Sequence, residues 1–175
     1  MINPRILFWA MIAALLLLIQ IKIMGANEMT FQITSPAFKN NEMIPRPYTC
    51  QGLDMNPRLI IQGVPTATKS LALIVDDPDA PGKTWVHWVV FNIPATSKEI
   101  PERNIPGIQG MNDFGQLNFG GPCPPSGTHR YFFKLYALDT LLDLPQGIRK
   151  ANLEKAMQGH ILGQTQLVGL YKKTP

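Results

Sequence analysis

A cluster of carboxylates follows an apolar segment in the first half of this chain, in a sequence typical of a turn. Residues 73–75 are Leu-Ile-Val, typical of a buried strand. Asp77 and Asp79 follow on either side of Pro78, and Pro81 comes two residues after Asp79. Proline restricts the backbone, so these carboxylates are expected at fixed positions beside the end of a strand. Such groups can accept hydrogen bonds or take part in acid–base chemistry.

Two histidines each lie two residues from an aromatic side chain. Trp85 and His87 form the first pair, and His129 and Tyr131 form the second. Side chains two residues apart on a strand face the same side of a sheet. If neighbouring strands bring both pairs to the carboxylates, the result is a polar pocket with an aromatic wall. An imidazole beside a carboxylate holds its proton more strongly, so raised histidine pKa values are expected there.

A loop rich in glycine and proline, residues 120–127, precedes the second pair. The N–H groups of Gly120 and Gly121 can form an anion-binding nest. Pro122 and the prolines after it keep the loop rigid, which lowers the cost of ordering it on binding. With cationic imidazoles and the Tyr131 hydroxyl as donors, these groups predict a small anion or phosphate site.

Each feature also has a purely structural interpretation. Residues 77–81 make a good turn sequence by themselves. A single histidine in a strand is commonly structural, and Trp88 and Phe133 lie in apolar runs typical of a core. The ligand-site hypothesis rests on convergence, because two separate strand-and-loop segments both supply polar groups.

The elements that must position these groups have the pattern of strands separated by long loops. Strands are expected at residues 31–35, 59–62, 70–76, 85–93, 130–137 and 166–172, with irregular stretches at 36–58 and 94–128. Asn152 is typical of a helix N-cap, and Gly159 is a stop signal for a short C-terminal helix. The pattern predicts a mainly β protein, an antiparallel β-sandwich with a short C-terminal helix and long loops.

Composition indicates one globular domain, which we expect over residues 27–175. Apolar residues make up 45% of the 175 residues and charged residues 16%, which excludes a disordered chain. The net charge of +4 comes without a block of lysines or arginines. Nucleic acid is therefore not an expected partner, because phosphate-backbone binding needs a basic stripe.

The first 26 residues are typical of a signal peptide or an N-terminal anchor. Arg5 precedes a continuous apolar run over residues 6–19, and Lys22 lies beyond it. We expect a periplasmic or secreted protein, with an inner-membrane anchored form as the alternative. Membrane contact is expected only through residues 6–24, if they remain uncleaved.

The two cysteines, Cys50 and Cys123, are an even pair in a chain expected to be exported. A disulfide is the first hypothesis, because exported proteins reach an oxidising compartment. Two buried free thiols are one alternative. The other is Cys123 as a nucleophile activated by His129.

The chain resembles the phosphatidylethanolamine-binding protein family, and in particular its bacterial and archaeal Raf kinase inhibitor-like branch. The resemblance covers roughly residues 31–172. It rests on residues 77–81, 85–88, 92–95, 112–115, 120–125, 129–131, 156–162 and 169–171.

The resemblance implies a β-sandwich with a small anion pocket that binds phosphate-type groups, including phospholipid head groups. The pocket residues it implies are Asp77, Asp79, Pro81, Trp85, His87, Gly121, Pro122, His129 and Tyr131. Ile61, Asn56 and Phe119 stand where the family often has Trp, Ser and Tyr, which bears on ligand shape.

Three functions fit these residues. The first is a non-catalytic protein that binds a small anionic or phosphorylated ligand, since no G-x-S-x-G motif supplies a nucleophile. No cofactor is expected. The second is a protease or kinase inhibitor that acts on a target enzyme through loops flanking the pocket. The third is a metal-dependent hydrolase using Asp77, Asp79, His87 and His129, although no compact metal motif is present.

Overall fold

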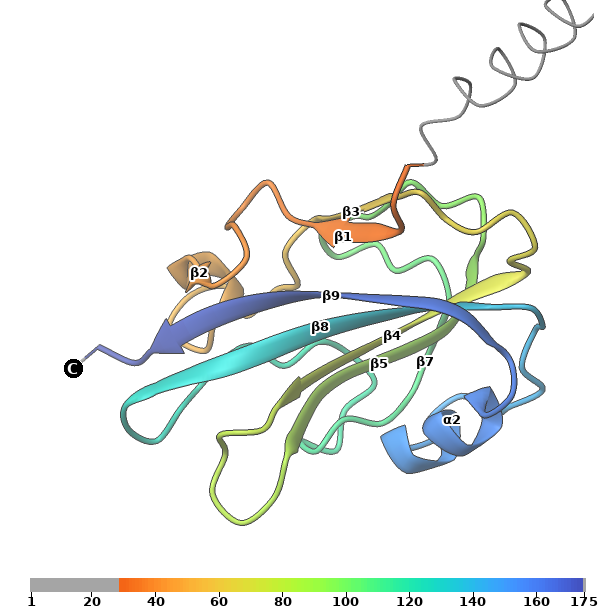
Figure 1. Cartoon of the computed structure of the whole chain (residues 1–175). Coiled ribbons are helices and arrows are strands. Elements are labelled where there is room, and N and C mark those ends of the chain that lie inside the picture. The colour runs from red at the N-terminus through yellow and green to blue at the C-terminus, as the bar shows by residue number, and fades with distance from the viewer. Residues whose placement is uncertain (1–28, 175) are drawn as a thin grey trace, which may run out of the picture.

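Two β-sheets pack face to face, with one short helix on the outer side of the larger sheet (Figure 1). The computed structural model describes residues 29–174. The smaller sheet has the strand order β1-β3-β6, and the larger has the order β2-β9-β8-β4-β5-β7. The elements are β1 (Gln32–Thr34), β2 (Glu42–Met43), η1 (Arg46–Tyr48), β3 (Leu59–Gln62), β4 (Ser70–Asp77), β5 (Trp85–Pro94), β6 (Glu99–Ile100), β7 (Ile108–Gln109), β8 (Thr128–Leu138), α2 (Lys150–Met157) and β9 (Ile161–Lys172).

Strand β4 lies at the centre of the fold, and all eight of its residues are buried. Alternate side chains of β4 enter two separate cores. Leu71, Leu73 and Val75 join the core between the sheets. Ala72 and Ile74 join a second core beneath α2. Cover on both faces explains why this strand is apolar rather than alternating.

The predicted β-sandwich is confirmed, with one local exception to its antiparallel pairing. β2 pairs with β9 in parallel, whereas β9-β8, β8-β4 and β4-β5 are antiparallel. The stretches expected to be irregular contain the short elements β2, η1, β6 and β7.

The last strand begins five residues earlier than its sequence pattern suggests, at Ile161 instead of Gln166. Gly163 has weak strand preference, and the polar residues around it give no apolar alternation. They are strand nevertheless, because they continue the pairing with β8, from Gly163 opposite Ala137 to Thr165 opposite Leu135. Pairing with a long neighbour overrides local propensity here.

The predicted helix is present, but the prediction of Asn152 as its N-cap is wrong. The helix begins at Lys150, and Arg149 occupies the N-cap without a side-chain hydrogen bond. Leu153 and Met157 supply the buried face. Gly159 follows the helix with φ +79°, a left-handed conformation that glycine adopts freely.

The predicted signal peptide or anchor, residues 1–26, lies outside the described residues. Within residues 29–174, no helix is long and apolar enough to cross a membrane.

Candidate functional site

A pocket of about 230 Å³ lies where β4 ends and β5 and β8 begin. Asp77 is the last residue of β4 and lies opposite Trp85, the first residue of β5. The neighbouring β8 brings Tyr131 to the same end of the sheet. We call this cavity the Asp77 pocket. It is lined by Asp77, Ala80, Pro81, Trp85, His87, Phe114, Cys123, Pro124, Pro125 and Tyr131.

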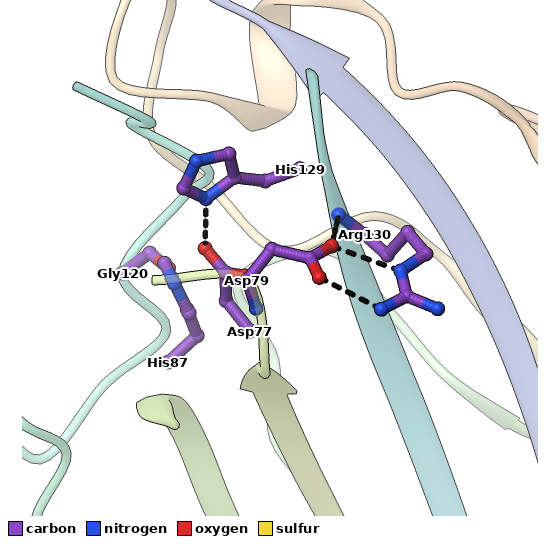
Figure 2. A network of polar contacts seen from close by, with 6 residues as sticks. All are labelled: Asp77, Asp79, His87, Gly120, His129 and Arg130. Atoms are coloured by element: carbon purple, nitrogen blue, oxygen red, sulfur yellow. Dashed lines mark hydrogen bonds and ion pairs between the residues drawn. The ribbon is translucent and has the colours of Figure 1, made fainter. Parts of the chain in front are cut away.

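Asp77 is buried, and both of its carboxylate oxygens take part in hydrogen bonds; Figure 2 shows the one with His129. Its Oδ2 lies 2.7 Å from Nδ1 of His129, which is also buried. Its Oδ1 accepts a hydrogen bond from the Asp79 backbone N–H at 2.8 Å. His129 is absent from the lining residues, so it contributes to the pocket only by holding Asp77 in position.

One ring nitrogen of His87 is hydrogen-bonded to the protein, and the ring itself lines the pocket. Its Nδ1 donates to the Gly120 carbonyl oxygen at 2.6 Å, and only 3% of the residue is exposed. Nε2 has no hydrogen-bond partner among residues 29–174. Burial lowers the pKa of His87 below its usual 6.5, an effect that outweighs the Gly120 bond and the nearby carboxylates. The expectation of a raised histidine pKa is therefore wrong for His87, because desolvation was not visible in the sequence.

Tyr131 supplies the pocket with a hydroxyl that lies near the Asp77 carboxylate and the Cys123 backbone but makes no hydrogen bond of normal geometry within residues 29–174. The residue is fully buried, and its ring meets that of His87 edge-on at a centroid distance of 5.1 Å. Burial and the nearby Asp77 carboxylate raise the pKa of Tyr131. The phenol therefore stays protonated, and a buried hydroxyl without a partner carries a desolvation cost that a ligand acceptor would relieve.

Asp79 points away from the pocket and towards Arg130 on β8 (Figure 2). Its Oδ1 accepts from Arg130 Nη2 at 2.7 Å, and its Oδ2 accepts from the Arg130 backbone N–H and Nε, both at 2.9 Å. The bonds from Arg130 lower the pKa of Asp79 to about 2. Asp79 thus fastens the turn to β8 instead of contacting a small ligand in the pocket.

The predicted anion nest at Gly120 and Gly121 does not form, because both N–H groups have protein partners. The Gly120 N–H donates to the His87 carbonyl oxygen at 3.0 Å, and the Gly121 N–H donates to Asp54 Oδ1 at 2.6 Å. A Cβ atom on Gly121 would lie 2.8 Å from the Tyr48 carbonyl oxygen, so this close approach needs glycine. Gly121 and Pro122 are buried behind the pocket wall and are not among its lining residues.

The predicted disulfide between Cys50 and Cys123 is present. It joins the loop after η1 to the Gly/Pro-rich loop, and a backbone hydrogen bond from Cys50 to Pro122 runs alongside it. Because Cys123 and the next two prolines line the pocket, this link holds one pocket wall in place.

Sequence reasoning missed Phe114, which forms the outer wall of the pocket. Its ring lies 5.5 Å from Trp85 and 5.4 Å from His87, both edge-on. The buried Asn112 positions it by accepting hydrogen bonds from the N–H groups of Phe114 and Gln116. Phe114 lies in a segment that resembles the family, yet its spacing to the other site residues gives no sign of this contact.

At neutral pH the wall of the pocket presents one carboxylate, a neutral His87 and a protonated phenol. In residues 29–174 no group of three or more His, Cys, Asp or Glu side chains is arranged to hold a metal ion. The arrangement suits reversible binding through hydrogen bonds, with apolar contact at the rim.

Comparison with known proteins places this geometry in a family. The family model described as phosphatidylethanolamine-binding protein matches residues 34–172. A UPF0098 protein of Methanothermobacter thermautotrophicus is 53% identical over 145 residues, covering 78% of this chain and 95% of that protein. A UPF0098 protein of Pyrococcus horikoshii is 49% identical over 160 residues, covering 85% and 80%.

Two solved structures share the fold. A phosphatidylethanolamine-binding protein homologue from Chlamydia trachomatis superimposes with a TM-score of 0.80 at 41% identity, covering 85% of this chain and all of that one. YbcL of Escherichia coli gives a TM-score of 0.77 at 35% identity, covering 82% and 99%. The chain therefore belongs to the phosphatidylethanolamine-binding protein family.

Proposed function

We propose that this protein binds a small anionic or phosphorylated ligand in the Asp77 pocket without chemical turnover. The observation that carries the proposal is the Tyr131 hydroxyl, a buried donor at the pocket wall that makes no hydrogen bond of normal geometry within the described chain. Buried polar groups are nearly always hydrogen-bonded. A ligand oxygen at this position would satisfy the hydroxyl.

Anion binding in this pocket requires a proton on His87. Nδ1 already donates to Gly120, so Nε2 is the nitrogen left to face a ligand. When neutral, Nε2 is only an acceptor, and it becomes a donor on protonation. An anion would stabilise this cation, and binding would therefore be accompanied by proton uptake at Nε2.

Asp77 sets a further requirement on the ligand. Each of its oxygens already accepts one hydrogen bond, from His129 or from the backbone of Asp79. A ligand beside this carboxylate must bring a donor of its own, such as the hydroxyl of a phosphate monoanion or an ammonium group. Phosphate esters that carry an ammonium meet this requirement, which supports a phospholipid-head-group-like ligand.

The rim of the pocket supports a ligand with an apolar remainder. Pro81, Phe114 and Pro125 are exposed beside Trp85, so apolar surface surrounds the polar floor. The disulfide supports an oxidising location, the periplasm or the exterior of the cell.

Calorimetric titration with phosphate and with phosphoethanolamine tests the proposal. Wild-type protein should bind both, and Tyr131→Phe should weaken phosphate binding by about tenfold, the loss of one hydrogen bond to a charged group. Tyr48→Phe is the matched control, because the Tyr48 hydroxyl donates to Glu102 and lies outside the pocket. Equal phosphate affinity in wild type and Tyr131→Phe would contradict the proposal.

A further inference from the structure

A second cavity, of about 350 Å³, is lined by loop residues and by Gln109 of β7, and it shares no lining residue with the Asp77 pocket. We call it the Arg103 cavity. Its volume is within the range of small-molecule sites. Its lining residues are Leu53, Asp54, Met55, Asn56, Arg103, Ile105, Gln109, Asn118 and Phe119.

Both charged residues of this cavity have a left-handed backbone. Asp54 has φ +52° and Arg103 has φ +57°. Aspartate tolerates this region, whereas arginine has no local hydrogen bond to favour it. Asn56 holds the arginine in place: its Oδ1 accepts from the Arg103 N–H at 3.0 Å, and its Nδ2 donates to the Pro101 carbonyl oxygen at 2.9 Å. Arginine therefore carries a local conformational cost here that glycine would avoid.

The guanidinium of Arg103 differs from those of the other arginines between residues 29 and 174. Arg58, Arg130 and Arg149 each lie against a carboxylate, and Arg46 donates to the Gln51 carbonyl oxygen. Within the same part of the chain, the Arg103 side chain has no hydrogen bond or ion pair. A planar guanidinium without a partner is suited to bidentate contact with a carboxylate.

Asp54 offers the opposite charge to the same cavity. Its Oδ1 accepts from the Gly121 N–H, while Oδ2 has no partner in the described residues. Asp54 and Arg103 line one cavity but form no ion pair with each other within residues 29–174. Both residues are exposed, so their charged groups can meet a ligand that carries both charges.

Neutral donors and an apolar surface complete the cavity. Gln109 accepts from Trp88 through Oε1 at 2.9 Å, which turns its Nε2 donor to other partners. Met55, Ile105 and Phe119 supply apolar contact.

We propose that the Arg103 cavity binds a small zwitterion of the α-amino acid type. Arg103 would hold the carboxylate, Asp54 would hold the ammonium, and the apolar residues would contact the side chain. The site is separate from the anion site proposed above, so either can fail without the other.

The experiment is an NMR titration of wild-type protein with L-alanine, followed through backbone amide shifts. Alaninamide and N-acetylalanine are the matched ligands, since the first lacks the carboxylate and the second lacks the ammonium. We expect saturable shifts at Asp54, Arg103 and Gln109 with alanine. Each matched ligand should bind at least tenfold more weakly.

Two variants separate binding from folding. Asp54→Asn removes the charge but keeps the oxygen that accepts from Gly121. Arg103→Gly removes the side chain and relieves the left-handed backbone, so its unfolding midpoint should equal or exceed that of wild type. Both should weaken alanine binding at least tenfold. The proposal would be overturned by absence of saturable shifts, by equal binding of N-acetylalanine, or by a lower midpoint in Arg103→Gly.

Discussion

Ligand affinity of the Asp77 pocket should fall steeply as the pH rises, because His87 must gain a proton to bind an anion. Burial keeps the pKa of free His87 below 6.5. Above that value the free imidazole is neutral, whereas the liganded imidazole is a cation. Each binding event then takes up one proton, and mass action weakens the apparent affinity as protons become scarce.

The magnitude follows from one proton per ligand. Well above the pKa of the free imidazole, the apparent Kd rises tenfold for each pH unit, equivalent to about 1.4 kcal/mol. This slope holds between the lowered pKa of free His87 and the higher pKa of the liganded imidazole. Between pH 6.5 and about 8.5 the affinity should therefore fall by up to about 100-fold.

Phosphoethanolamine is the suitable ligand for this measurement, because its ammonium supplies the donor that Asp77 requires and its charge changes little in this range. Isothermal titration at several pH values gives the slope directly. His87→Gln places a permanent donor near the position of Nε2 and should bind with little dependence on pH. His87→Asn keeps a donor for the Gly120 carbonyl but loses Nε2, so it should bind weakly at every pH. A flat wild-type profile, or an unchanged slope in His87→Gln, would refute the reasoning.

Three further perturbations have defined outcomes. Tyr131→Phe should leave the free energy of unfolding unchanged or raise it by about 1 kcal/mol in urea titration. The hydroxyl that it removes is buried and makes no hydrogen bond of normal geometry in the described chain. A clear loss of stability would show that the hydroxyl is hydrogen-bonded within the protein. Replacing Cys50 and Cys123 by serine removes a link of sequence separation 73 and should cost about 4 kcal/mol, and reduced wild type should match the variant in denaturant unfolding. Asp76→Asn removes the buried carboxylate that both Lys134 and Lys150 contact, and it leaves Lys150 only the more distant Glu154. A loss of about 2 kcal/mol and faster amide exchange in α2 are expected, and unchanged exchange would contradict this role.

The polar groups on strands were the most predictable part of the site. Alternation along β5 and β8 places Trp85 with His87, and Tyr131 two residues after His129. Antiparallel pairing with β4 then brings Asp77 opposite Trp85. Both steps depend on strand periodicity, which a sequence displays directly.

The contributions of loops were less predictable, because they depend on contacts between distant residues. Phe114 lies in a turn that Asn112 fixes, by accepting from the Phe114 and Gln116 N–H groups and donating to the Asn118 carbonyl oxygen. The N–H of Gly121 is occupied by Asp54, which lies 67 residues away in the sequence. The lowered pKa of His87 depends on how completely the ring is buried, and no local pattern encodes that.

The most direct measurement is the ¹⁵N spectrum of the His87 imidazole at pH 7, recorded with and without saturating phosphate. In the free protein, Nδ1 should carry the proton shared with Gly120, and Nε2 should be unprotonated. Addition of phosphate should move Nε2 to the chemical shift of a protonated nitrogen and leave Nδ1 bonded to Gly120. An Nε2 that stays unprotonated while phosphate binds, or phosphate shifts centred away from Asp77 and Tyr131, would contradict an anion site built on His87.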